Sequence, residues 1–333
     1  MTSAQPIILH HFERSPFSEK VRLTFGLKGI EWTSCLQSRI MPRPDLTPMT
    51  GGYRRTPTLQ IGADIYCDTQ IILRELQRRH PEPTLYPGAS EGLCSASAMW
   101  TDRVFFQNTV NLVFGSIADK VPQEFIADRE QLRGQKFDVP GMTAAIPQMR
   151  DQFRAHVDWI DRQLADGRRW LLGSAASLLD INAYMNVWYV RSNLEEAETL
   201  IGPFRHARAW EDRVRAIGHG KRVKEIAPAE ALAIGRAATP LTPAQADPGD
   251  PNGLKPGDKV KVVPDDYGKV PVTGTIVSSS AQHIALRRQH EQNRRPMRVL
   301  LADASEPQGK LLSIWFEQDR KSAVYGKSVD VGG

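Results

Sequence analysis

Cysteine is scarce in this chain of 333 residues, and its spacing excludes several kinds of site. The three cysteines, Cys35, Cys67 and Cys94, are odd in number and form no C-x-x-C pair. A disulfide framework and a cysteine metal site are therefore not expected, and the usage fits a reducing compartment. Cys35 and Cys67 lie in strand-like runs and are predicted to be small core residues. The histidines show no metal-ligand spacing, since His10 and His11 are neighbours that point to opposite faces of a strand, so no metal is predicted.

Long apolar runs and a strong charge imbalance are also missing. No stretch approaches the length of a membrane span, and Met1 to Pro6 contain no basic leader. Lysine plus arginine number 43 and aspartate plus glutamate 38, an excess too small to require nucleic acid or a membrane as partner. We therefore expect a cytoplasmic location without membrane or nucleic-acid partners. The length, with 41% apolar residues and no internal repeat, predicts two or three domains.

The first part of the chain alternates strand and helix signals. The expected strands are Ile7–Phe12, Glu31–Leu36, Thr58–Ile61 and Ile65–Cys67, and the expected helices are Ser15–Lys28 and Thr69–Arg79. This order, βαβ followed by ββα, predicts a small α/β unit with a mixed sheet over residues 1–88.

Ser15 and Pro16 mark the start of the first helix. Pro16 suits the first helical turn, because its fixed φ fits there and its missing N–H would be unpaired anyway. Ser15 is then the natural N-cap, with its hydroxyl beside free backbone N–H groups. A hydroxyl at the positive end of a helix can hold an anion, although capping alone also accounts for a serine here.

Four features between Ile7 and Leu76 together resemble the N-terminal, thioredoxin-like domain of glutathione transferases. They are Ser15-Pro16-Phe17-Ser18 at the first helix, Thr56-Pro57 before a strand, Asp68-Thr69 opening the next helix, and the apolar face of Ile71, Ile72 and Leu76. The resemblance is to serine-type members, similar to the omega or zeta classes. It implies a glutathione co-substrate, a small electrophilic substrate, a homodimer and a detoxifying activity.

The resemblance also implies roles for individual residues. Ser15 would stabilise the glutathione thiolate, and a cis Thr56–Pro57 bond would turn the N–H and C=O of Thr56 toward the ligand backbone. Asp68-Thr69 would hold the γ-glutamyl end of glutathione, and Phe17 would also contact glutathione. Arg55, with Arg54, can meet a ligand carboxylate, or both can be solvated loop arginines. Asp68 can equally be a plain helix cap. Ser15 and Ser18 stand where a thioredoxin has two cysteines, which excludes dithiol exchange at this site.

Residues 92–235 carry helical patterns without convincing strands. The expected helices are Leu93–Gly115, Gln123–Arg133, Met142–Ala165, Leu178–Ser192 and Phe204–Ile217. Ser177 and Asp180 have capping-box spacing. This resembles the buried helix start of the all-helical transferase C-terminal domain. The electrophile pocket is expected between the two domains, with Phe17, Trp100, Phe105 and Phe106 as candidates; aromatic residues at helical spacing can instead be core.

The composition changes twice more. Residues 236–253 have the proline-rich composition of a linker. Five expected strands in residues 254–331, namely Lys259–Val263, Val270–Val277, His283–Arg288, Arg298–Leu301 and Leu311–Phe316, suggest a small antiparallel, SH3-like barrel. Its arginines at 287–288, 294–295 and 298 can form a nucleic-acid patch or a solvated face; we favour the solvated face, and expect the module to pack on the helical domain or shield the pocket.

Two functions remain open at this point. One is glutathione-dependent transfer or isomerisation, in which the thiolate attacks a small electrophile. The other is a non-catalytic transferase-like fold that binds a ligand or a partner protein, because fold does not fix function.

Overall fold

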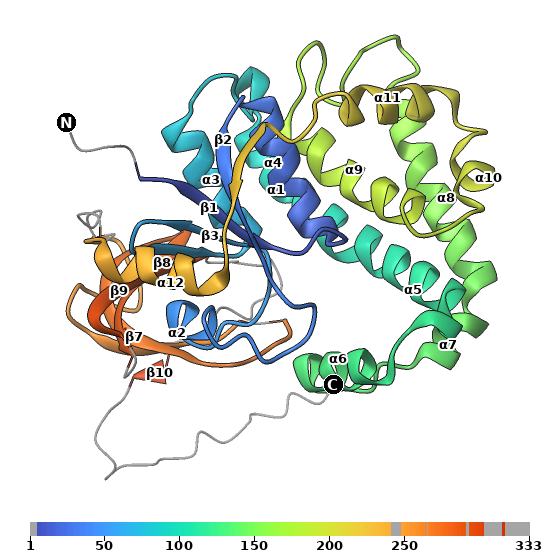
Figure 1. Cartoon of the computed structure of the whole chain (residues 1–333). Helices are drawn as coiled ribbons and strands as arrows, with labels where there is room; N and C mark the ends of the chain where they lie inside the picture. Colours follow the sequence, from blue (N-terminus) through green and yellow to red (C-terminus); the bar gives the residue numbers. More distant parts are fainter. Residues whose placement is uncertain (1–4, 241–247, 265, 291–292, 303–314, 317–333) are drawn as a thin grey trace, which may run out of the picture.

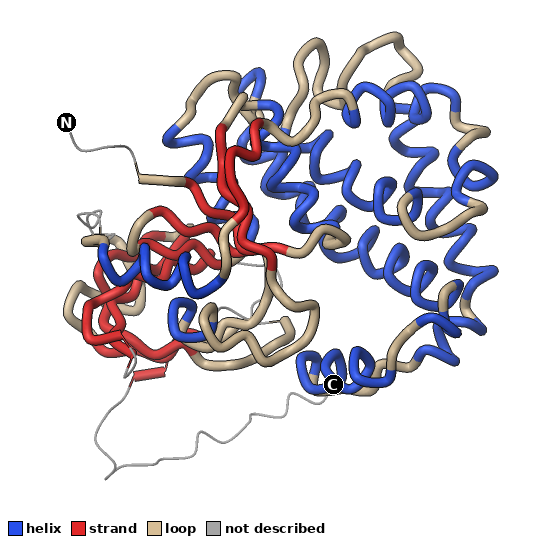
Figure 2. The backbone as a smooth tube through the Cα atoms, in the orientation of Figure 1, coloured by secondary structure: helices blue, strands red, loops and turns tan. Residues whose placement is uncertain are grey.

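The structure is a computed structural model that describes residues 5–240, 248–264, 266–290, 293–302 and 315–316. Strands gather on one side of the molecule and helices α4 to α11 on the other (Figures 1 and 2). The first part has the expected α/β order. Its elements are β1 (Ile7–His11), α1 (Pro16–Leu27), β2 (Glu31–Leu36), α2 (Thr47–Thr50), β3 (Thr58–Ile61), β4 (Asp64–Cys67) and α3 (Thr69–Arg79).

The helical part matches the expected positions with several differences. Its main helices are α4 (Glu91–Met99), α5 (Phe106–Ser116), α6 (Gln123–Arg133), α7 (Val139–Ala144), α8 (Ile146–Gln163), α9 (Leu178–Arg191), α10 (Ala197–Ile201) and α11 (Arg205–Arg215). A π-helical stretch, Trp100–Phe105, interrupts the long helix predicted over Leu93–Gly115. No helix among the described residues has the length and apolar character that crossing a membrane requires.

A buried capping box fixes the start of α9. The Ser177 hydroxyl accepts from the Asp180 N–H, and the Asp180 carboxylate accepts from the backbone N–H of Ser177 at 2.9 Å. The same carboxylate accepts from the Trp210 indole at 2.8 Å and from the Leu171 N–H at 2.9 Å, so it joins α9 to α11 and to the preceding turn. The predicted cap is confirmed.

The chain returns to the sheet after α11, in a range where the sequence indicated no strand. Strand β5 (Lys221–Glu225) pairs in parallel with β2, and α12 (Pro228–Ala237) follows it. The expectation that residues 92–235 contain no strand is therefore wrong. All five residues of β5 are exposed, so it lacks the apolar alternation by which strands are detected.

The last strands do not form a separate barrel in the described part of the chain. They are β6 (Lys259–Val262), β7 (Val272–Ser280), β8 (His283–His290), β9 (Asn293–Ala302) and β10 (Trp315–Phe316). β9 pairs in parallel with β4, which gives one open sheet in the order β10-β6-β7-β8-β9-β4-β3-β1-β2-β5. The expected SH3-like closure is corrected to an antiparallel meander that extends the first sheet, and residues 311–314 of the last expected strand lie outside the described residues.

Apart from the exposed edge strand β5, the sheet contributes to apolar clusters on both of its faces, with alternate residues on opposite sides. Ile8 and Ile65 share one apolar cluster with Leu286 of β8, and α2 and α12 supply Met49 and Leu232 to it.

The other face of the sheet contributes Leu9, Tyr66 and Ala285 to a second cluster. This cluster also contains Val21 and Phe25 of α1 and Ile72 of α3. The sheet thus carries α1 and α3 on one side, from which the functional site is built.

Candidate functional site

Two neighbouring cavities lie where the α/β part, the helical part and the β6–β7 connection meet. The large cavity, about 350 Å³, contains Ser15 in its wall, and the small cavity, about 140 Å³, contains Pro57, Asp68 and Thr69. Five residues line both cavities: Phe17, Arg55, Thr56, Phe106 and Tyr267. The structure therefore brings the residues predicted to contact glutathione to two adjoining cavities: Ser15, Phe17, Arg55, Thr56, Pro57, Asp68 and Thr69.

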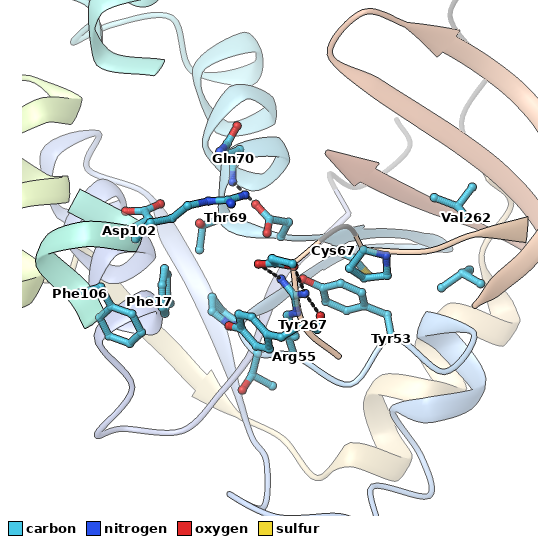
Figure 3. Close-up of a pocket in the computed structure, with 17 residues that line it drawn as sticks. Phe17, Tyr53, Arg55, Cys67, Thr69, Gln70, Asp102, Phe106, Val262 and Tyr267 are labelled. Atoms are coloured by element: carbon cyan, nitrogen blue, oxygen red, sulfur yellow. Dashed lines mark hydrogen bonds and ion pairs between the residues drawn. The ribbon is translucent and has the colours of Figure 1, made fainter. Parts of the chain in front are cut away.

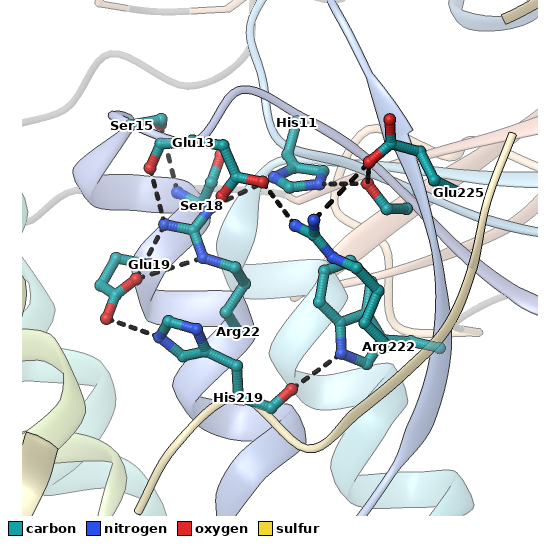
Figure 4. A network of polar contacts seen from close by, with 11 residues as sticks. His11, Glu13, Ser15, Ser18, Glu19, Arg22, His219, Arg222 and Glu225 are labelled. Carbon is teal, nitrogen blue, oxygen red and sulfur yellow. Dashed lines mark hydrogen bonds and ion pairs between the residues drawn. The ribbon is translucent and has the colours of Figure 1, made fainter. Parts of the chain in front are cut away.

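Ser15 caps α1 as expected. Its backbone is extended, with φ −82° and ψ 122°, and its Oγ accepts from the Ser18 N–H at 3.2 Å (Figure 4). This bond uses a lone pair of Oγ, so the hydroxyl proton of Ser15 can still be donated to a ligand. Ser18 lines neither cavity, and its own Oγ is buried without a hydrogen-bond partner.

Asp68 and Thr69 start α3 at the edge of the small cavity. The backbone of Asp68 has φ +91°, a value that residues other than glycine seldom adopt. Its Oδ1 accepts from the Gln70 N–H at 2.9 Å. Burial raises the pKa of Asp68, while the Gln70 N–H and Arg55 act in the opposite direction. Asp68, Thr69 and Gln70 all line the small cavity, so a carboxylate and the positive end of α3 border the same space, an arrangement that suits a zwitterionic end group. The Thr56–Pro57 bond beside them is cis.

Arg55 is turned toward the protein. Its guanidinium donates to the Asp266 carboxylate and to the Tyr267 carbonyl and stacks over the Tyr267 ring, with 3.9 Å between Cζ and the ring centroid (Figure 3). Its Nε is buried and has no partner. These bonds use three of the five guanidinium N–H donors, so a contact of Arg55 with a ligand carboxylate would have to use the Nε–H or the second Nη1–H. Arg54 likewise bonds Asp128, with 2.5 Å between nitrogen and oxygen, and neither arginine is a freely solvated loop residue.

The aromatic candidates divide into two groups. Phe17 and Phe106 meet edge to face, with ring centroids 4.8 Å apart, and both line the cavities (Figure 3). Phe105 is fully buried in the helical core, and Trp100 stacks on it while donating to His156 at 3.1 Å. Neither of these two lines the two cavities, so they are corrected from pocket candidates: Phe105 is a core residue, and Trp100 is half-buried and packs against that core.

Other predictions about single residues can be compared with their surroundings. Cys35 and Cys67 are fully buried, as predicted, and burial raises the pKa of Cys35 to about 12. His10 bonds Gln60 while His11 bonds Ser34, on opposite faces of β1. Arg288 is half-buried: its Nε donates to the Thr273 carbonyl and its Nη1 is buried, whereas the neighbouring Arg287 is exposed. In the described ranges no three His, Cys, Asp or Glu side chains gather as metal ligands.

Several residues around the cavities were missed by the sequence reasoning. Asp102 lines the small cavity and forms an ion pair of 2.6 Å with Lys20, which ties the π-helical stretch to α1. Asp266 and Tyr267 belong to the connection between β6 and β7; Tyr267 lines both cavities, and Asp266 lines the small one. In the same connection, the Gly268 N–H donates to the Leu132 carbonyl of α6 at 2.8 Å. The last part of the chain thus covers part of the pocket.

Charge is unevenly distributed between the two cavities. Among the described residues that line it, the large cavity has no aspartate or glutamate but eight cationic side chains: Arg14, Arg39, Arg43, Arg54, Arg55, Lys120, Arg129 and Arg133. Its apolar wall includes Phe114, Phe125 and Phe137. On α6, Phe125, Arg129 and Arg133 follow one another at four-residue spacing, a signal of one helix face that could have been recognised in the sequence.

These elements define a class of fold in which a thioredoxin-like α/β unit is joined to an all-helical unit, with cavities between them. Residues 9–84 match the family model described as glutathione S-transferase, N-terminal domain, and residues 143–213 match the model of the C-terminal domain. A solved GST-like protein from Pseudomonas syringae is 32% identical with a TM-score of 0.74, and the match covers 90% of this chain and 96% of that one. The chain belongs to the glutathione transferase family.

Two further relatives extend the comparison. A glutathione S-transferase from Rhodospirillum rubrum F11 shares the fold at 21% identity and a TM-score of 0.51, over 63% of this chain and 88% of that one. "FtsZ-localized protein A" of Caulobacter vibrioides is 28% identical over 181 residues, which are 53% of this chain and 73% of that protein.

Proposed function

We propose that this protein transfers glutathione to a small electrophile, with the Ser15 hydroxyl stabilising the thiolate of glutathione. The γ-glutamyl end would lie in the small cavity against Asp68 and Thr69, and the backbone of the tripeptide would pair with Thr56. The sulfur would then reach the large cavity at Ser15. The observation that carries the proposal is the adjacency of the two cavities, which share Phe17, Arg55 and Thr56.

The energetics of thiol activation are within reach of this site. An unperturbed thiol has a pKa of about 8.5, and half ionisation at neutral pH requires a shift of about 1.5 units, roughly 2 kcal/mol. A hydrogen bond to a charged group contributes about 1.5–3 kcal/mol, and a helix terminus adds about 0.3–1 kcal/mol. Ser15 would therefore supply the larger share. In the reaction a sulfur electron pair forms the new C–S bond, and the leaving group departs with the electron pair of the bond that breaks.

Ser15→Ala tests this role directly. We expect the variant to bind glutathione but to lose most of the thiolate absorbance that appears on binding at neutral pH. The loss of the cap costs about 1 kcal/mol of stability and leaves the fold intact. Ser18→Ala is the matched control, since it removes a hydroxyl one turn further along α1 that lines neither cavity. Wild-type thiolate absorbance in Ser15→Ala would contradict the proposal.

A second candidate is a non-catalytic role in which the same fold binds a partner protein. It is favoured by the similarity to a relative whose name records localisation to FtsZ. Failure of the wild-type chain to bind glutathione at millimolar concentration would support this candidate and remove the first. Three expectations stay predictions: the homodimer, the cytoplasmic location and the detoxifying role. Light scattering of the purified chain would measure its mass in solution and so test the homodimer.

A further inference from the structure

The large cavity holds more positive charge than its neighbouring carboxylates balance. Asp128 pairs with Arg54 at 2.5 Å and lies 3.9 Å from Arg129, and Asp266 pairs with Arg55. When these two acids are set against the eight lining cations, six positive charges remain within the part of the chain that the structure describes. Such an excess in a partly closed space attracts anions and repels cations.

The arginines around Asp128 are crowded and partly desolvated. Arg43 is buried and donates to the carbonyls of Ser38 and Arg54, not to an acid. The pKa of Arg43 is lowered to about 10, chiefly by burial and also by the charges of Arg129 and Arg54, while Asp128 acts in the opposite direction. Arg129 donates to the Arg39 carbonyl at 2.6 Å. A bound anion would relieve this repulsion, because each like charge raises the cost of the others at low dielectric.

The cationic groups lie over aromatic rings. The Cζ atoms of Arg39 and Arg129 are 5.0 and 4.5 Å from the centroid of Phe125, and Arg133 lies over Phe137 at 5.6 Å. Phe114 packs against both rings. The wall therefore offers apolar ring faces with guanidinium groups above them, a surface that fits a flat apolar body carrying an anionic group.

Glutathione alone does not account for this charge. Its γ-glutamyl carboxylate and ammonium belong, in the proposed pose, to the small cavity. At most its glycyl carboxylate and its thiolate reach the large cavity. Two negative charges leave most of the excess without a partner.

We propose that the second substrate of this site is an organic anion, an apolar and flat molecule with a carboxylate, sulfonate or phosphate group that the large cavity binds beside glutathione. The inference rests on the proposed function, since it names the class of electrophile that the glutathione site would act on. Arg39, Arg43 and Arg129 are specificity-determining residues, and Phe125 supplies the apolar contact.

Two fluorescent probes with closely related ring systems test the proposal. Anilinonaphthalene sulfonate carries one negative charge, and phenylnaphthylamine is its neutral counterpart. Titrated into the full chain saturated with glutathione, the sulfonate is expected to bind at least about tenfold more tightly than the neutral probe, as one additional charge-assisted contact provides. Arg39→Gln/Arg129→Gln should remove most of this preference and leave the neutral probe's affinity within about twofold.

The controls separate the cavity from the rest of the surface. Arg39→Gln alone changes an exposed side chain and preserves the fold, and it should weaken the sulfonate in the same direction. Arg162→Gln removes an exposed arginine of α8 that lines neither cavity, and it should change neither probe. Equal affinities for the two probes, an unchanged preference in the double variant, or displacement of the sulfonate by glutathione would overturn the proposal. Glutathione binding is measured separately on the same samples. If glutathione does not bind, the proposed function is contradicted, but the ratio of the two probe affinities still decides whether the cavity prefers anions.

Discussion

His10 shows how one buried side chain ties stability to pH. It is fully buried in β1, where its Nε2 contacts Gln60 Oε1 at 2.9 Å and its Nδ1 contacts Gln37 Nε2 at 3.2 Å. Burial lowers the pKa of His10 to about 4, only partly opposed by the hydrogen bond with Gln60. The folded protein therefore holds this imidazole neutral at pH values where the unfolded chain protonates it.

This difference predicts a loss of stability in mild acid. Between the unfolded pKa of about 6.5 and the folded pKa of about 4, the unfolded state binds more protons, so the free energy of unfolding falls as pH falls. Above pH 6.5 His10 makes its full contribution to the free energy of unfolding, and about 3 kcal/mol of that contribution is lost by pH 4. Urea titrations across this range measure the effect.

His10→Gln is the variant that isolates this contribution. It keeps a polar side chain but cannot become charged, so the slope of stability against pH should decrease. His11, whose pKa is lowered to about 3 by burial and by Arg22, keeps the remaining slope. An unchanged slope in His10→Gln would show that His10 is not the group that titrates.

Elements whose signals are local were predictable from the sequence, and those that depend on distant partners were not. Residues 123–133 follow a helical apolar pattern and form α6 over the predicted range. The exposed β5 exists because the backbone of β2 pairs with it. For the site, Ser15 and Asp68 carry capping signals within a few residues of themselves. The contact of Arg55 with Asp266 joins positions 211 residues apart, so no local pattern reveals it.

The close approach of α1 to the loop before β5 gives a prediction about Gly26. A Cβ at this position would lie 2.0 Å from the Gly218 carbonyl oxygen and 2.8 Å from that of Ile217. Alanine normally stabilises a helix relative to glycine, but here backbone atoms must move, so Gly26→Ala should cost about 1–3 kcal/mol. Urea unfolding at neutral pH measures the change.

Gly92 provides the matched comparison. It lies in α4, and a Cβ there would meet no atom within 4 Å. Gly92→Ala should therefore stabilise the protein by roughly 0.5 kcal/mol through helix propensity alone. If both substitutions changed the free energy of unfolding in the same direction, the contact between α1 and residues 217–218 would not limit the packing of α1.

The continuous sheet makes the two ends of the described chain depend on each other. β4 lies between β3 and β9, so the hairpin that supplies Asp68 has its outer edge covered by a strand from beyond residue 290. Leu286 and Val299 share an apolar cluster with Ile8 and Ile65. An independent C-terminal barrel would have left β4 as an edge strand and this core face exposed.

A chain that ends at residue 240 tests this dependence. It keeps all of β1 to β5 but loses the partner of β4 and the C-terminal half of the shared apolar cluster. We expect it to aggregate or to unfold at much lower denaturant concentration, because an exposed apolar edge strand pairs with other chains. Addition of residues 248–333 as a separate fragment should restore part of the stability by supplying β9 to β4.

A substitution in the intact chain tests the same dependence of β1–β5 on the last strands without exposing the edge of β4. Leu286 of β8 is fully buried, so Leu286→Ala should cost about 2–5 kcal/mol. Because the strand belongs to a continuous sheet, calorimetry should show the unfolding of β1–β5 moving to lower temperature together with that of β6–β9. Hydrogen exchange of the β3 and β4 amides should accelerate to the same extent. A separate low-temperature transition, with unchanged exchange in β3 and β4, would mean that the last strands fold as an independent unit despite their pairing with β4.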